Sequence, residues 1–154
     1  MRRRAVVAGL ASLLWAGGVL ADCWQEAARR HDLEPQLLMA IAQVESGFKV
    51  DAIHVNRDGS RDIGLMQINS QHLPRLSRRG ITEPLLLSDP CVAVEAGALI
   101  LAEFVARHGY NWTAVGAYNA GSSPAREALR LRYARKVWTH YHAWHVHRGS
   151  ARRL

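Results

Sequence analysis

Apolar residues recur at helical spacing in the segment between Pro35 and Gly47. Counting back from Glu45 in helical steps reaches Ile41 and Leu38, and the segment contains no turn residue. Proline is well tolerated at the first position of a helix, and glycine commonly follows the last one. The pattern therefore predicts a helix over 35–46 in which the carboxylate of Glu45 continues the apolar stripe.

This position is unfavourable for an ionised Glu45. The last turn of a helix carries a partial negative charge, and an apolar environment also disfavours the charged form. Both effects raise the pKa of a carboxyl group, and a carboxylic acid that stays protonated near neutral pH can act as a general acid. The alternative is a surface glutamate that merely follows an apolar helix.

The periodicity changes after Gly47. Residues 56–60 carry an Asp-Gly turn signal, and residues 62–69 alternate between apolar and polar positions. We expect a short β-hairpin or three-strand flap over 50–68, followed by a helix that Asn69 or Ser70 caps and that ends near Leu76.

Capping residues and helical spacing predict the other elements. A mainly helical chain with one small β flap belongs to the α+β class. Residues 82–90 are expected to be irregular. The expected helices are 23–31, capped by Asp22; 90–108, capped by Asp89; one capped by Asn111; one that begins at 123–124; and 132–145.

Four segments together resemble the lytic transglycosylases with a lysozyme-like domain, the soluble family 1 type. They are Glu45-Ser46-Gly47-Phe48, Gly64-Leu65-Met66-Gln67-Ile68-Asn69, Ala117-Tyr118-Asn119-Ala120-Gly121 and the weaker Tyr133-Ala134-Arg135-Lys136-Val137. The resemblance covers nearly all of residues 22–141 in the family's order. It implies a lysozyme-like fold and cleavage of the β-1,4 bond between N-acetylmuramic acid (MurNAc) and N-acetylglucosamine (GlcNAc) in peptidoglycan, with a 1,6-anhydro product and no cofactor.

The resemblance also implies roles for particular residues. Glu45 would carry out both proton transfers, and Ser46 would hydrogen-bond to it and orient it. Tyr133 would place its hydroxyl against the acid, although the Glu-Thr pair usual before this tyrosine is absent. The residues implied to bind substrate, with Met66 and Gln67 in the cleft wall, are Ser46, Met66, Gln67, Asn69, Tyr118, Asn119 and Tyr133.

Two other functions remain open. The candidates for a second acid are Asp51, Asp58 and Asp62, of which Asp51 begins the flap and Asp58 belongs to the turn, so both are expected to be solvated. If Asp62 lies across the cleft, a hydrolytic, lysozyme-type muramidase reaction becomes possible. A non-catalytic peptidoglycan-binding assembly factor would keep its function without Glu45. By family analogy alone, a small single domain is expected to open the wall locally for a secretion apparatus or a pilus.

The N-terminus reads as a secretory signal peptide. Arg2, Arg3 and Arg4 precede an apolar run, and small residues precede a cut after Ala21, so residues 1–21 would be removed on the way to the periplasm. A retained membrane anchor is the alternative, although the run is short. The predicted organisation is a leader over 1–21, a catalytic domain over 22–147 and a disordered basic tail over 148–154.

Two cysteines, Cys23 and Cys91, remain after the leader. In an exported protein an even pair indicates a disulfide, here between the mature N-terminus and the start of the longest helix. Two unpaired buried thiols are the alternative.

The charge of the chain narrows its partners. The formal charge of +7 falls to +4 when the three leader arginines are removed, because no acid leaves with them. This charge suits an anionic glycan, and no stripe of interleaved aromatic and basic residues indicates nucleic-acid binding. The histidines at 140, 142, 145 and 147 do not share a helix face, so no metal site is expected. We expect a monomer.

Overall fold

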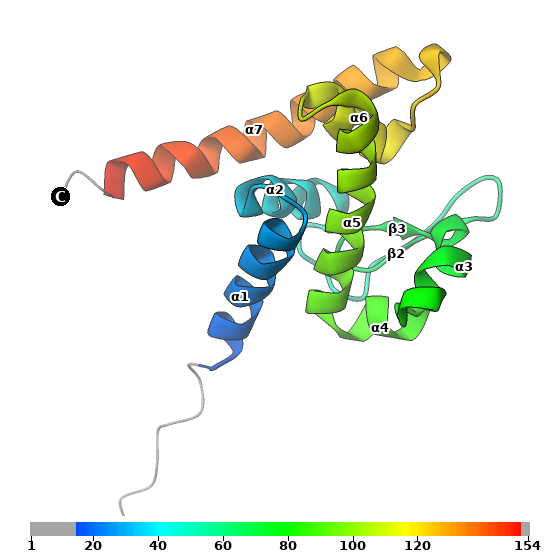
Figure 1. Ribbon diagram of the computed structural model, residues 1–154, viewed down its shortest axis with the longest axis horizontal. Helices are drawn as coiled ribbons and strands as arrows, with labels where there is room; N and C mark the ends of the chain where they lie inside the picture. The colour runs from blue at the N-terminus through cyan, green and yellow to red at the C-terminus, as the bar shows by residue number, and fades with distance from the viewer. Residues whose placement is uncertain (1–14, 152–154) are drawn as a thin grey trace, which may run out of the picture.

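A computed structural model describes the backbone of residues 15–151 and the side chains of residues 22–145. The elements are mostly helices, and three short strands follow the second of them (Figure 1). In chain order they are α1 (Trp15–Arg30), α2 (Pro35–Ser46), β1 (Ile53–Val55), β2 (Arg61–Ile63), β3 (Ile68–Asn69), η1 (Ser70–His72), α3 (Leu73–Leu76), η2 (Ser77–Arg79), α4 (Glu83–Ser88), α5 (Pro90–His108), α6 (Trp112–Ala120), η3 (Pro124–Arg126) and α7 (Glu127–Ala151).

The three strands form an antiparallel sheet in the order β1-β2-β3, which confirms the predicted flap. Ile53 pairs with Ile63, and Ile63 pairs with Ile68. The turn between β1 and β2 closes through a hydrogen bond of 3.0 Å from the Gly59 N–H to the Asn56 carbonyl. The flap, here residues 53–69, lies on one side of the long helix α5 (Figure 1).

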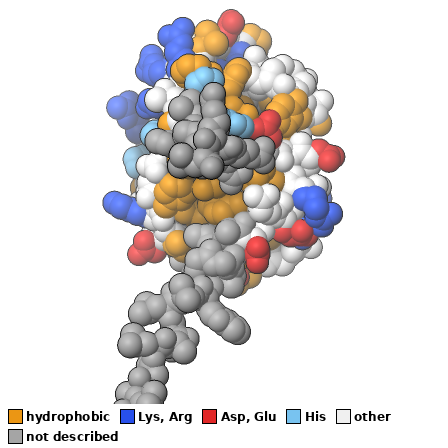
Figure 2. Space-filling view, turned by 90° about the vertical axis from the view of Figure 1, so that its left-hand side faces the viewer, with side chains coloured by type: hydrophobic (Ala, Val, Ile, Leu, Met, Phe, Trp, Pro, Cys, Tyr) orange, Lys and Arg blue, Asp and Glu red, His pale blue; other side chains and the backbone are white. Residues whose placement is uncertain are grey.

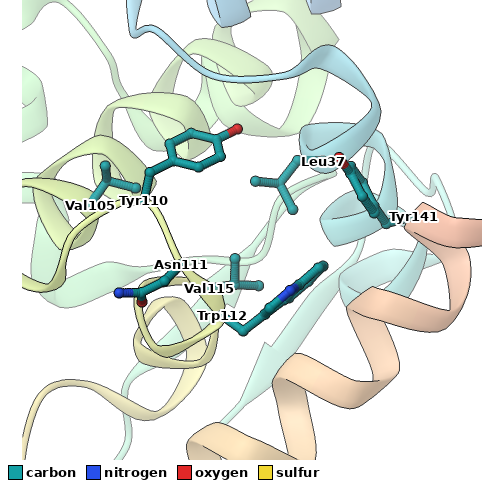
Figure 3. A pocket seen from close by; sticks show the side chains of 7 residues that line it. All are labelled: Leu37, Val105, Tyr110, Asn111, Trp112, Val115 and Tyr141. Atoms are coloured by element: carbon teal, nitrogen blue, oxygen red, sulfur yellow. The ribbon is translucent and has the colours of Figure 1, made fainter. Parts of the chain in front are cut away.

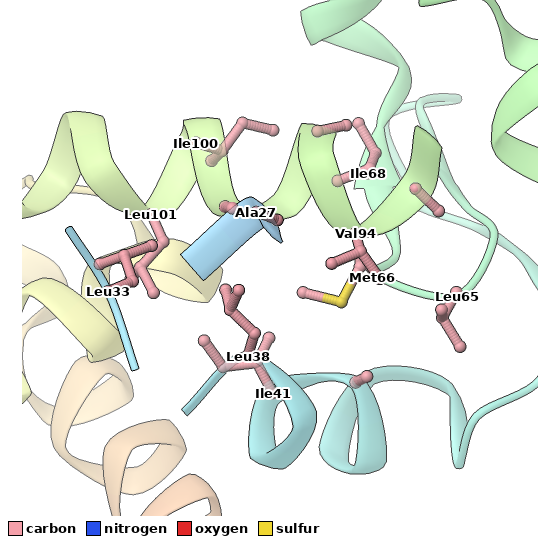
Figure 4. Packing of buried hydrophobic residues seen from close by; sticks show 14 of the residues in the cluster. Ala27, Leu33, Leu38, Ile41, Leu65, Met66, Ile68, Val94, Ile100 and Leu101 are labelled. Atoms are coloured by element: carbon pink, nitrogen blue, oxygen red, sulfur yellow. The ribbon is translucent and has the colours of Figure 1, made fainter. Parts of the chain in front are cut away.

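The core lies where α2, α5 and the end of the flap meet (Figure 4). Leu38 and Ile41 of α2 are fully buried, and Met66 from the flap is fully buried with them. Gly97 of α5 allows this approach, since a Cβ at that position would lie 2.6 Å from the Met66 Cε. The apolar stripe predicted for α2 therefore packs inward, as its spacing required.

Helix α7 lies across α2 and α6 (Figure 1), and these two pairs have extensive contacts. The close approach to α6 depends on Gly116, because a Cβ there would lie 2.5 Å from the Arg130 carbonyl oxygen. This packing brings the first half of α7 to the C-terminal end of α2, where Glu45 lies.

A disulfide joins Cys23 in α1 to Cys91 in the first turn of α5, with 5.2 Å between the Cα atoms. The expected pairing is therefore confirmed, and the alternative of two unpaired thiols is wrong. The helix boundaries at this point also follow the prediction. Asp89 accepts hydrogen bonds from the backbone N–H groups of Cys91 and Val92, and α5 starts at Pro90.

Three predicted boundaries are wrong. Helix α1 begins at Trp15, so Asp22 lies inside it and caps nothing. The segment expected to be irregular contains α4, in which Pro84 occupies a first-turn position that does not require a backbone N–H. The two expected C-terminal helices are one, since α7 runs from Glu127 to Ala151 and no proline or glycine interrupts its first turns.

The expectations for the two ends fall partly outside the described residues. Residues 1–14, most of the proposed leader, and residues 152–154 are not described. The helix α7 continues past His147, where the sequence placed the end of the domain. No helix in the described part of the chain has the length and apolar character needed to cross a membrane.

Figure 2 shows one face of the molecule. Apolar side chains gather near its centre, and several basic side chains lie along the left-hand edge of that view.

Candidate active site

Glu45 is the penultimate residue of α2, and its side chain lines a cleft of about 710 Å³. The helix ends directly after it because Gly47 adopts a left-handed conformation, with φ of +59°, and its N–H donates to the Gln43 carbonyl. The cleft lies between the flap and α6. Its lining also includes residues from α5 and from the connection that leads into α7.

The carboxyl of Glu45 accepts a hydrogen bond of 2.5 Å from the Tyr133 hydroxyl of α7. Burial raises the pKa of the Glu45 carboxyl to about 7, against the lowering effect of this hydrogen bond. The charge of Asp62 raises the pKa further, and the charge of Lys136 lowers it. The direction agrees with the sequence argument, and its main cause is burial. Near neutral pH the group can therefore both give and take a proton.

A second phenol approaches the cleft from α6. The Tyr118 hydroxyl donates to the Met66 carbonyl at 2.9 Å, and its ring lines the cleft beside Asn119. Burial, followed by the charge of Glu45, holds the pKa of both Tyr118 and Tyr133 above the usual range. Both phenols therefore remain protonated hydrogen-bond donors at neutral pH.

Gln67 lines the cleft from a strained backbone conformation, with φ of +48°. Its Nε2 donates to the carbonyls of Gly64 at 2.9 Å and Ala52 at 3.2 Å. Gly64 itself has φ of +73°, and a Cβ there would lie 2.1 Å from the Leu86 carbonyl oxygen. The Gly-Leu-Met-Gln segment is therefore a close turn that sets the direction of the Gln67 side chain.

Asp62 also lines the cleft, where two amide side chains hold both of its oxygens. Asn69 Nδ2 donates to Oδ1 at 2.8 Å, and Asn56 Nδ2 donates to Oδ2 at 3.0 Å. Asp62 and Asn69 are cross-strand partners in the sheet, so the pairing of β2 with β3 brings these two side chains together. The acid singled out from the sequence thus shares the cleft with Glu45.

Two of the residues expected to face substrate are not in the lining of the cleft, namely Ser46 and Met66. The Ser46 hydroxyl donates to the Leu65 carbonyl at 2.7 Å and makes no hydrogen bond to Glu45, so it fastens α2 to the flap instead of orienting the acid. The Met66 side chain is fully buried under α5 and does not line the cleft, although its carbonyl holds Tyr118. The Ser46 hydroxyl of α2 therefore points to the flap backbone, and the Met66 side chain points into the core.

The structure adds cleft residues that the sequence analysis did not single out as site residues. They come from the flap tip, from the turn after β3, from α5 and from η3, and they include Asn56, Arg57, Asp58, Ser60, Gln71, His72, Phe104 and Arg126. The sequence identified the flap-tip residues as a turn, and it assigned Asp58 to solvent although this acid lines the cleft. The others belong to no motif. Among the side chains of residues 22–145, no group of three or more His, Cys, Asp or Glu residues could hold a metal ion.

A smaller apolar pocket of about 200 Å³ lies apart from Glu45, between α2, α5, α6 and α7 (Figure 3). Leu37, Tyr110, Trp112 and Tyr141 are among its walls, and no carboxylate or histidine from the side chains of residues 22–145 lines it. The amide of Asn111, which also lines it, caps α6 by accepting from the Ala114 N–H.

Comparison with known proteins places the chain in a family. The model of the transglycosylase SLT domain matches residues 22–141. The chain is similar to the invasion protein IagB of Salmonella typhimurium, with 55% identity over 121 residues that span 79% of this chain and 76% of IagB. It is similar to protein IpgF of Shigella flexneri, with 47% identity over 121 residues that span 79% of this chain and 80% of IpgF.

The fold has a counterpart among solved structures. An inactive mutant of the lytic transglycosylase Slt from Pseudomonas aeruginosa superposes with a TM-score of 0.61 and 24% identity, over 79% of this chain and 23% of that one. The likeness confirms the expected lysozyme-like fold, although this chain spans only about a quarter of that larger protein. With the family match over most of its length, the chain belongs to the transglycosylase SLT domain family of peptidoglycan lytic transglycosylases.

Proposed function

We propose that Glu45 is the acid and base of this lytic transglycosylase, and that it cleaves the MurNAc-β-1,4-GlcNAc bond with formation of a 1,6-anhydroMurNAc end. One observation carries the proposal: a partly buried carboxyl whose pKa is raised to about 7 lies in the large cleft and bonds a protonated tyrosine. A surface glutamate would have neither the raised pKa nor the cleft.

The reaction balances with a single carboxyl. Glu45 donates its proton to the glycosidic oxygen as the bond from that oxygen to C1 of MurNAc breaks. The ionised Glu45 then takes the proton of the C6 hydroxyl as O6 bonds to C1, which closes the anhydro ring and restores the acid. The nucleophile belongs to the substrate, so its effective concentration far exceeds that of a free water molecule.

The surrounding residues support these two transfers. Tyr133 stabilises the ionised form of Glu45 through its hydrogen bond, which favours release of the first proton. Asn119 is exposed on the cleft wall beside Tyr118 and can bond a sugar hydroxyl or acetamido group. Gln67 has its amide nitrogen committed to the turn, so its carbonyl oxygen is the atom available to an acetamido N–H. Asn69 contributes indirectly, because its hydrogen bond holds the Asp62 carboxylate in position.

Digestion of purified sacculi tests the proposal. The wild type should release anhydro-muropeptides, and Glu45→Gln should release none above background, because the amide can neither donate nor accept the catalytic proton. Glu127→Gln, at an exposed position on α7, is the matched control and should keep full activity. Full activity in Glu45→Gln would refute the assignment. A chain that binds sacculi without cleaving them in either form would favour the non-catalytic assembly factor.

Hydrolysis is the second candidate reaction, because Asp62 shares the cleft with Glu45 and its charge acts on that acid. A fixed carboxylate there could stabilise positive charge at C1 while water replaces the C6 hydroxyl. The products distinguish the two reactions: water would leave a reducing end that carries ¹⁸O from labelled solvent, whereas the transglycosylase reaction leaves an unlabelled anhydro end. Asp62→Asn should abolish only the labelled product.

The setting of the reaction is also part of the proposal. The basic and apolar leader supports export to the periplasm with cleavage after Ala21, and the similarity to an invasion protein supports local wall opening for a secretion apparatus or pilus. Fractionation of cells and N-terminal sequencing of the exported chain test the first point. Loss of apparatus assembly in a Glu45→Gln strain, with normal growth, tests the second.

A further inference from the structure

Two arginines line the cleft without an acid to pair with. Arg57 lies in the turn at the flap tip, and Arg126 ends η3, between α6 and α7. Both are exposed, and neither forms an ion pair with any side chain of residues 22–145. By contrast, Arg61 and Arg75 are paired with Glu83 and Glu103. The two cleft arginines therefore present free cations from two separate segments of the wall.

The backbone that carries Arg126 is held by a buried guanidinium. Arg130 is 9% exposed, and its Nη1 donates to the carbonyls of Ser123 at 2.6 Å and Gly121 at 3.2 Å. The Arg126 N–H also donates to the Ser123 carbonyl. These bonds satisfy carbonyls at the C-terminal end of α6 and define the connection that places Arg126 at the cleft.

The turn that carries Arg57 is similarly well defined. The Asp58 carboxylate accepts from both the N–H and the hydroxyl of Ser60, and the Asn56 amide bonds Asp62 and Ser60. Asp58 is thus engaged within the turn and forms no ion pair with Arg57.

The cleft also contains negative charge, which makes the unpaired cations significant. Asp58 and Asp62 line it together with Glu45, and an anionic strand would be repelled if these were the only charges. Wall strands bear carboxylates, either in the stem peptides or, where the peptide has been removed, in the lactyl group of MurNAc.

We propose that Arg57 and Arg126 bind carboxylates of the wall strand and so make the enzyme selective for anionic strands over neutral glycan. This inference rests on the proposed function. A planar guanidinium can form two parallel hydrogen bonds to a carboxylate, which adds orientation to charge attraction.

Three soluble substrates test the proposal: peptide-bearing strands, strands treated with an amidase so that only lactyl carboxylates remain, and neutral GlcNAc oligomers. The double variant Arg57→Gln/Arg126→Gln is compared with Arg78→Gln/Arg79→Gln, which removes the same charge from the exposed turn η2 outside the cleft. We expect the cleft variant to lose roughly tenfold in kcat/KM on a carboxylate-bearing strand, through KM, with little change on the neutral oligomer. Added salt should reduce the difference in kcat/KM between the wild type and the cleft variant, because it screens the charge attraction.

The pattern of losses identifies the source of the carboxylate. A loss confined to peptide-bearing strands assigns the stem peptide, and a loss confined to amidase-treated strands assigns the lactyl group. Equal losses on all three substrates, or equal behaviour of the cleft and η2 variants, would overturn the proposal. Affinity measurements in a Glu45→Gln background repeat the comparison without turnover. These affinities show whether the two arginines bind strand carboxylates even if the wild type cleaves no strand. A failure of the wild type to cleave would count against the proposed function and not against this inference.

Discussion

The raised pKa of Glu45 should be measurable as a pH-dependent stability difference, independently of any catalytic assay. The carboxyl moves from an ordinary value of 4.5 to about 7, mainly through burial. Each pKa unit corresponds to about 1.4 kcal/mol, so the folded state favours the protonated form by about 3 kcal/mol. Because the folded pKa lies above the unfolded one, this contribution is complete below about pH 4.5 and is lost as the pH rises through about 7.

The perturbation is Glu45→Gln, which resembles the protonated acid and can still accept the Tyr133 hydrogen bond. Urea unfolding of wild type and variant, followed by tryptophan fluorescence, gives the difference in free energy of unfolding at each pH. Between about pH 5 and pH 8 that difference should move by about 2.5 kcal/mol in favour of the variant.

Glu127→Gln is the matched control for this measurement, since it makes the same substitution at an exposed glutamate that does not line the cleft. Its difference from wild type should stay constant. A change of less than about 1 kcal/mol for Glu45→Gln, or a change of the opposite sign, would show that burial does not hold the proton on Glu45, and the general-acid argument would fail with it.

Other perturbations follow from the same contacts. Tyr133→Phe removes a hydrogen bond that lowers the pKa of Glu45, so the alkaline limb of the pH–rate profile should move to higher pH; a shift to lower pH would contradict this reading. Cys91→Ser opens a disulfide that spans 68 residues and should lower the free energy of unfolding by about 4 kcal/mol in urea titrations under oxidising conditions, a loss that reductant should reproduce in the wild type. Gly64→Ala meets both a positive φ and the Leu86 carbonyl, so it should destabilise the chain by several kcal/mol, whereas Gly59→Ala, with the same sign of φ but open space, should cost only about 1 kcal/mol; equal costs would refute the steric argument.

The elements that the sequence predicted well are those governed by local contacts. Asp89 and Pro90 start α5 and Gly109 follows its last residue, because a cap, a first-turn proline and a terminating glycine act within a few positions along the chain. The same locality explains why the segment 82–90 was misread: α4 is a short helix, and tertiary packing of Leu86 in the core stabilises it more than propensity does.

In the candidate site, too, local features were predicted from the sequence and long-range ones were not. The apolar periodicity of α2 was enough to place Glu45 at a helix end beside buried residues, and hence to predict the direction of its pKa shift. The family motifs named Tyr133 and Asn119. They did not show that Ser46 and the Met66 side chain turn away from the cleft, because those directions depend on how the flap packs against α2 and α5.

By itself, then, the sequence determined the helices with strong caps, the acid at the end of α2, the paired cysteines and the family. Only the tertiary structure decided which groups meet across long stretches of chain. Glu45 and Tyr133 are 88 residues apart, and Arg57 and Arg126 reach one cleft from the flap and from the far side of α6. Local propensity acts only between residues a few positions apart in the chain. These long-range contacts therefore form only once the core between α2, α5 and α7 has formed.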